Sequence, residues 1–228
     1  MKIITYATHA TGTFDRLMDS GYPIEILGWG TKWNGFMDKF NGVLEYLKNQ
    51  NDDEIIVFMD GFDSLINKNL DTLEQEFKSL NCKVLVSQED KNGASLLFPS
   101  FVHKYITSKV FPVCNNNLIG NTGLYMGYCK ELKMLLEKIK GTDFKDDQRS
   151  FNSMCKHFSF IRVDSEKLIF ENLSSTRDVS DAYFVQYPAT MNKSRFLRAL
   201  CEYYEYFIPE LAIVVLIVVL IIDVLRKR

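Results

Sequence analysis

The run Ile55–Met59 most constrains the fold, because five consecutive apolar residues, four of them β-branched or aromatic, end abruptly at an aspartate. A run this short and this apolar is typical of a strand buried on both faces of a parallel sheet. Asp60 follows directly, Gly61 lets the backbone turn, and a second aspartate, Asp63, lies two residues after Gly61. The sequence therefore predicts an α/β domain with two carboxylates at the carboxyl edge of its sheet, where such folds bind ligands.

Two interpretations of this aspartate pair stay open. Carboxylates are hard oxygen ligands that suit Mn²⁺ or Mg²⁺, so Asp60 and Asp63 are candidate metal ligands. They are also compatible with ordinary turn residues, because aspartate stabilises turns and a helix is expected to begin near Leu70. The pair alone does not decide between a metal site and a turn.

Length and charge limit the classes of protein that fit. The chain has 228 residues, of which residues 1–200 are long enough for one α/β domain with a full core. The formal net charge of −2 and the pI near 6.0 provide no basic field, so no nucleic-acid partner is expected.

The cysteines and the N-terminus indicate a reducing compartment. The five cysteines are widely spaced and form no C-x-x-C pattern, so we expect neither a zinc site nor a disulfide framework. The N-terminus lacks the apolar core of a secretory signal. We therefore expect the domain to face the cytoplasm.

The C-terminus has a different composition from the rest of the chain. Leu211–Ile222 is an uninterrupted run of twelve apolar residues, and the window 206–225 extends it to a helix of roughly 30 Å, which matches a bilayer. Tyrosines at 203, 204 and 206 precede it and the basic tail 226–228 follows, as at membrane interfaces. We expect a single-pass tail anchor, with a buried strand or core helix as the alternative.

Two N-terminal segments are candidates for binding a nucleotide. The strand expected over Lys2–Ala7 would place Thr5, Tyr6 and Thr8 at its carboxyl end, where nucleotide bases bind in such folds. The glycine-rich segment 28–35, which contains Trp33, is too turn-prone for a helix or strand interior. It is expected to form a lid over a ligand, or to pack back on the core.

Further polar residues are expected near the same edge. Lys39 lies off the apolar stripe of the helix expected over 36–47, so it is either solvated or a partner for a phosphate. Residues 87–90 end another strand with polar groups, and Asn121 lies in a predicted turn before a short strand. Asp146 and Asp147 precede a helix, where carboxylates are favourable with or without a chemical role.

Taken together, residues 2–193 resemble the glycosyltransferase domain of the procollagen lysyl hydroxylases and related collagen glycosyltransferases. Seven segments occur in the family's order: Ile4–Thr8, Leu27–Gly30 with Trp33, Met59–Asp63, Val86–Ser87, Asn121–Gly123, Asp146–Gln148 and Ile169–Leu173.

The resemblance implies a GT-A (Rossmann-like) fold with a mixed sheet flanked by helices, a UDP-sugar donor and Mn²⁺. By this likeness Asp60 and Asp63 are metal ligands, and Phe62 takes the place of the family's base-contacting tyrosine. The family's final strand carries a histidine metal ligand in a Val-His-Gly-like sequence. This chain has Gln186 there, which offers a carbonyl oxygen.

The expected activity is transfer of a hexose from UDP-glucose or UDP-galactose to a protein or glycan hydroxyl, with Asp146 or Asp147 on the acceptor side. The donor would contact Thr5, Tyr6, Thr8, Trp33, Lys39, Phe62 and Asn121. Two alternatives remain: a membrane-anchored domain that binds a nucleotide sugar or glycan without transfer, and a structural or attachment protein.

Overall fold

The computed structural model describes residues 1–89, 105, 108–173, 175, 177–188, 201 and 203–226. Its larger sheet has the strand order β2-β1-β3-β6-β5-β7. The strands are β1 (Lys2–Tyr6), β2 (Ile24–Leu27), β3 (Ile55–Asp60), β5 (Val84–Gln88), β6 (Gly120–Tyr128) and β7 (Ile161–Asp164). Only β6 runs antiparallel to its neighbours in this described sheet. The predicted mixed sheet is confirmed, although β3 has one antiparallel neighbour where the sequence suggests parallel ones.

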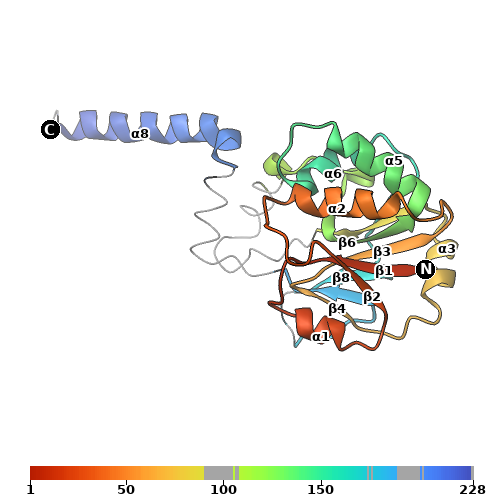
Figure 1. Ribbon diagram of the computed structural model, residues 1–228. Helices are drawn as coiled ribbons and strands as arrows, with labels where there is room; N and C mark the ends of the chain where they lie inside the picture. Colours follow the sequence, from red (N-terminus) through yellow and green to blue (C-terminus); the bar gives the residue numbers. More distant parts are fainter. Residues whose placement is uncertain are drawn as a thin grey trace.

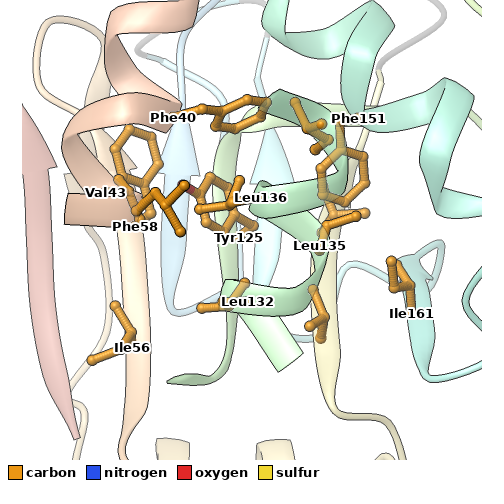
Figure 2. Close-up of a cluster of buried hydrophobic side chains, with 14 of the residues drawn as sticks. Phe40, Val43, Ile56, Phe58, Tyr125, Leu132, Leu135, Leu136, Phe151 and Ile161 are labelled. Carbon is orange, nitrogen blue, oxygen red and sulfur yellow. The ribbon is translucent and has the colours of Figure 1, made fainter. Parts of the chain in front are cut away.

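Helices cover both faces of this sheet (Figure 1). One face carries α2 (Met37–Leu47), α5 (Cys129–Lys140) and α6 (Asp147–Cys155), and the other carries α1 (Phe14–Met18) and α3 (Leu73–Ser79). Each helix buries the apolar stripe that its 3.6-residue spacing produces. Figure 2 shows the core under the first face, which includes Phe40, Val43, Phe58, Tyr125, Leu132, Leu135, Leu136 and Phe151.

A smaller sheet with the order β4-β9-β8 packs beside the larger one. Its strands are β4 (Ser64–Ile66), β9 (Phe184–Gln186) and β8 (Phe170–Asn172). In it, Ser64 and Asn172 are the pairing partners of Gln186 on its two sides. The three-residue β4 is too short for its periodicity to be recognised, yet this strand is what brings the Asp60–Asp63 turn to β9.

The cysteine prediction is wrong. Cys114 and Cys155 form a disulfide with a Cα–Cα distance of 5.2 Å across a sequence separation of 41. Cys114 directly precedes a short 3₁₀ turn, η1 (Asn115–Asn117), and Cys155 ends α6. Sequence spacing did not reveal the pair, because only the packing of α6 against the sheet brings the two residues together.

The C-terminal helix α8 (Ile208–Arg226) follows the 3₁₀ turn η2 (Tyr204–Phe207) and extends away from the α/β domain (Figure 1). The stretch Tyr204–Asp223 is long and apolar enough to cross a membrane, with a mean hydropathy of 2.5, and none of it is buried. The alternative of a buried core helix is therefore excluded for these residues.

Candidate functional site

The two motif aspartates lie where β3 leaves the sheet. β3 is buried up to Met59, and the Asp60 side chain is 23% exposed. The Thr5 hydroxyl donates to the Met59 carbonyl at 2.7 Å and lies under the turn. A Cβ on Gly61 would come within 2.9 Å of that hydroxyl oxygen, so glycine allows this close approach. Thr5 is completely buried, and its geometry is that of a support for the turn.

Lys39 is buried, which corrects the expectation of a solvated helix lysine. Its Nζ lies 3.0 and 3.3 Å from the two Asp60 carboxylate oxygens and 2.7 Å from Asp147 Oδ2. The lysine stem runs past the Phe36 ring, whose centre is 6.0 Å from Nζ, and delivers the ammonium to the sheet edge. One cation thus bridges two carboxylates that lie 87 residues apart in the sequence, Asp60 and Asp147.

The electrostatics of this cluster follow from burial opposed by charge pairing. Burial alone would lower the pKa of Lys39, but the carboxylates of Asp147 and Asp60 outweigh it and raise that pKa. Burial raises the pKa of Asp60, Lys39 opposes this shift, and Asp147 adds to it. The ammonium therefore stays protonated and is the counter-ion of both acids.

Asp147 and Asp146 have separate tasks at the start of α6. Asp147 is buried, and its Oδ2 also accepts a hydrogen bond of 3.0 Å from the Thr122 hydroxyl on β6. Asp146 is the N-cap residue, and its Oδ1 accepts from the Arg149 backbone N–H at 2.7 Å. The predicted helix N-terminus is confirmed, and its two acids lie beside the β3 edge.

Gln186 lies on the other side of the turn. Its Nε2 donates to Asp63 Oδ1 at 3.1 Å, and its side chain packs on Gly123, where a Cβ would come within 2.1 Å. Its Oε1 is buried and has no hydrogen-bond partner among the described residues. On the neighbouring strand, Asn172 Nδ2 donates to the Gln88 carbonyl at 2.6 Å, and Asn172 Oδ1 is likewise buried without a described partner.

Asn121 lies inside β6, not in the predicted turn, because the strand continues through Asn121 and Thr122. Its Nδ2 donates to Glu89 Oε2 at 2.8 Å, and its Oδ1 accepts from the Gly123 N–H at 2.9 Å. Gln148 Nε2 also donates to Glu89 Oε2, at 2.9 Å. Glu89 therefore connects β6 with α6. Asp90, the last residue of the polar stretch noted in the sequence, lies outside the described residues.

Aromatic side chains line the rim next to β1. Trp33 is exposed and makes an edge contact with Tyr6 at 6.0 Å between ring centres. Tyr6 itself is almost entirely buried under Gly28 and Gly42. Thr8 pairs with the neighbouring His9 ring at 2.9 Å, and the Phe62 ring lies 5.4 Å from that ring. Among the predicted donor contacts here, Trp33 is the most accessible.

The residues present fit a hard divalent cation only in part. Among the described residues, no three His, Cys, Asp or Glu side chains form a group that would hold a metal ion. Asp60 and Asp63 supply carboxylate oxygens, and the unpaired Gln186 Oε1 supplies a third oxygen of the type that Mn²⁺ and Mg²⁺ accept. These three side chains therefore offer oxygen ligands of a suitable type, but the described residues do not form a complete metal site.

Sequence reasoning missed Thr122, Asn172 and Tyr125 as site residues. Tyr125 stacks on Phe58 with 4.7 Å between the ring centres. Its buried hydroxyl lies close to the charges of Lys39 and Asp147 and has no hydrogen-bond partner among the described residues. Burial raises the pKa of this phenol. Thr122 and Asn172 lie in two of the segments that resemble the family, which was the available signal, whereas Tyr125 lies in an apolar part of β6 that gave none.

The chain is similar in sequence to known procollagen lysyl hydroxylases. Procollagen-lysine,2-oxoglutarate 5-dioxygenase 1 of Gallus gallus is 27% identical over 197 residues, covering 78% of this chain and 26% of that protein. The multifunctional procollagen lysine hydroxylase and glycosyltransferase of Caenorhabditis elegans is 27% identical over 198 residues, covering 76% and 26%. This chain thus spans about a quarter of the length of these relatives.

Solved structures identify the fold. The galactosyltransferase LgtC in complex with donor and acceptor sugar analogs superposes with a TM-score of 0.50 at 11% identity, covering 90% of this chain and 95% of that one. The mixed sheet with flanking helices is therefore that of the GT-A glycosyltransferases. Residues 1–197 match the family described as the PLOD GT domain, and the chain belongs to that family.

Proposed function

We propose that this protein is a metal-dependent glycosyltransferase that moves a hexose from UDP-glucose or UDP-galactose to a protein or glycan hydroxyl. The observation that carries the proposal is that three separate segments bring Asp60 with Asp63, Asp147 and Gln186 to one edge of a GT-A sheet. Membership of the PLOD GT domain family supports the same reaction class.

Asp60, Asp63 and Gln186 would hold Mn²⁺ or Mg²⁺. Such an ion, when bound, neutralises negative charge that develops on the diphosphate leaving group. Lys39 has a matching task in the chain itself. Lys39 would give up its salt bridge with Asp60 when that carboxylate binds the metal ion, and would remain paired with Asp147. Its ammonium would then provide a positive charge next to the phosphates of the donor.

The acceptor side is assigned to the start of α6. Asp147 is fixed by Lys39 and Thr122, so it can orient an acceptor hydroxyl or stabilise positive charge at the sugar carbon. Burial, followed by the neighbouring Asp147, raises the pKa of Asp146. A carboxylate with a raised pKa is a better proton acceptor, which suits Asp146 to receive the hydroxyl proton.

The donor base is assigned to the aromatic rim. Trp33 and Phe62 offer ring surfaces, Tyr6 and Thr8 shape the rim beneath them, and Asn121 lies further along the edge. The segment that carries Trp33 would close over the donor and exclude water, because water at this position would convert transfer into hydrolysis.

A nucleotide-sugar-binding domain without transfer is the second candidate. It is favoured by one observation, the salt bridge of Lys39 to Asp60, because that carboxylate must change partners before it can bind a metal ion.

We also propose that α8 anchors the domain in a membrane as a single-pass helix. The span 204–223 has a mean hydropathy of 2.5 and none of it is buried, which supports this role. The disulfide Cys114–Cys155 favours an oxidising compartment over the reducing, cytoplasmic one expected from the sequence, because disulfides are rare in reducing compartments.

The test is UDP release by the full chain in detergent, with UDP-glucose and UDP-galactose, with and without Mn²⁺. Without an added acceptor the sugar can pass only to water, so we expect slow, Mn²⁺-dependent release from one donor, lost in Asp60→Ala and in Asp63→Ala. Asp53→Ala, which changes an exposed acid at the other end of β3, is the matched control and should keep full release. Saturable donor binding without release from either sugar would favour the second candidate.

A further inference from the structure

The segment that leads into α8 folds back onto the site. We call residues Tyr203–Glu210 the α8 base. The Tyr203 hydroxyl donates to Asp146 Oδ2 at 2.5 Å, and the Arg149 guanidinium lies 4.0 Å from the centre of the Tyr206 ring. These two contacts join the α8 base to the first turn of α6, which carries the proposed acceptor-side acids.

A second set of contacts holds the end of the α8 base. Glu210 forms a salt bridge with Lys109 and accepts a hydrogen bond from the Tyr105 hydroxyl. The Phe111 ring lies 6.1 Å from the Tyr203 ring. The family match ends at residue 197, so the α8 base lies outside the matched residues.

The tyrosines that look like an aromatic membrane belt in sequence are thus divided. Tyr203 and Tyr206 contact the α/β domain, whereas Tyr204 is 47% exposed. All three tyrosines lie in the stretch expected at a bilayer interface, but Tyr203 and Tyr206 also connect the α/β domain to that stretch.

The contacts fix how far the site lies from lipid. The uninterrupted apolar run begins at Leu211, directly after Glu210. Eight residues in 3₁₀ and α geometry span only about 12–14 Å between Tyr203 and that run. The headgroup layer of a bilayer is itself about 5–8 Å thick on each side. The first turn of α6 therefore lies at the membrane surface if α8 spans the bilayer.

We propose that the α8 base docks the Asp146–Arg149 edge of the site against the membrane surface, so that the enzyme takes its acceptor hydroxyl from a molecule anchored in the same membrane. This inference rests on the proposed glycosyltransferase function for its acceptor and on the described contacts for its geometry. Asp146 has one oxygen on the helix cap and the other on Tyr203, so the docking also fixes the orientation of this carboxylate.

The test measures how close two points of the full chain lie to lipid. The chain is reconstituted in phosphatidylcholine vesicles that carry a headgroup-attached energy-transfer acceptor, with Cys201 replaced by serine in every sample. A donor dye is placed at Lys145→Cys, beside α6, or at Asp53→Cys, at the opposite end of the sheet. The domain is about 40 Å across, so the two positions are well separated.

We expect strong transfer from position 145 and weak transfer from position 53. The double variant Tyr203→Phe with Glu210→Gln should lower transfer from position 145, whereas Tyr204→Phe, a matched change at an exposed tyrosine, should not. Equal transfer from both positions, or no change in the double variant, would overturn the docking.

UDP release is measured on the same vesicles to separate the two proposals. Preserved Mn²⁺-dependent release together with equal transfer would refute the docking alone. Strong transfer from position 145 without release from any donor would keep the docking and refute the proposed enzyme.

Discussion

Beside Asp60, the described structure pairs each buried carboxylate with the ammonium of Lys39, whereas on the side of Asp63 two buried amide oxygens have no hydrogen-bond partner among the described residues. The first region, the Lys39 cluster, consists of Lys39, Asp60 and Asp147. The second, the amide pair, consists of Gln186 and Asn172 beside Asp63. The two regions lie on either side of one turn, but the buried charges of the first are paired, whereas the buried amide oxygens of the second have no described partner.

The difference indicates which region holds the fold and which one gains from a ligand. A buried ion triad loses several kcal/mol when one member is removed, because the remaining charges have no partner. A buried acceptor without a partner gains a bond when a ligand supplies a donor or a cation. We therefore expect changes in the Lys39 cluster to alter stability most and changes in the amide pair to alter ligand affinity most.

The largest effect is expected for Lys39→Met, which keeps the stem and removes the charge. Asp60 and Asp147 would lie buried without their counter-ion, at a cost of about 3–5 kcal/mol in the free energy of unfolding. Urea unfolding of the full chain in detergent measures this difference. Lys133→Met, which breaks an exposed pair with Asp52, is the control and should cost at most about 1 kcal/mol.

The same variant tests whether a metal ion and the ammonium share one carboxylate. Mn²⁺ should raise the stability of Lys39→Met more than that of the unmodified chain, because the ion replaces the missing positive charge at Asp60. Equal costs for Lys39→Met and Lys133→Met, or no additional Mn²⁺ effect, would contradict the shared-carboxylate interpretation.

The next effect concerns the disulfide that ends α6, the helix that carries Asp147. Replacing Cys114 and Cys155 by serine removes a cross-link over 41 residues and should cost about 2–4 kcal/mol. Thermal unfolding with and without dithiothreitol, together with a thiol count, measures it. Cys201→Ser, at an exposed free cysteine, should change nothing. Five free thiols in the native chain would show that the cross-link does not form.

In the amide pair, Gln186→His should raise affinity for Mn²⁺ by about 10-fold with little change in stability, because the family resemblance implies a histidine metal ligand at this position. Manganese titration followed by electron paramagnetic resonance measures binding directly, without turnover. Gln186→Leu removes the oxygen and should lower affinity. Equal affinity in all three proteins would place the ion away from β9.

The smallest effect is expected for Asp146→Asn, since asparagine caps a helix as well as aspartate does. The folded-state pKa of Asp146 is raised, so its stabilising contribution is complete below about pH 4 and is lost as pH rises through that raised value. The native chain should therefore lose stability relative to Asp146→Asn as pH rises from about 4 through the raised pKa of Asp146, by less than about 1 kcal/mol. Parallel unfolding curves at all pH values would refute the shift.

The sheet and helices follow from local patterns in the sequence. The apolar run before Asp60, the 3.6-residue spacing in α2, and the acids that begin α6 each predicted their element. Strand β4 and the strand conformation of Asn121 did not follow, because a three-residue strand has no period and an Asn-rich approach is turn-like.

What the sequence alone determined is therefore the chemistry available: carboxylates after a buried strand, an acidic helix start, and a glutamine, Gln186, at a position where the family resemblance implies a histidine. Tertiary structure alone decided their partners. Lys39, Tyr203 and Cys114 each meet residues more than 20 positions away, and such long-range pairs depend on how layers pack rather than on local preference. For this reason the buried lysine and the contact from α8 to Asp146 became visible only in the folded chain.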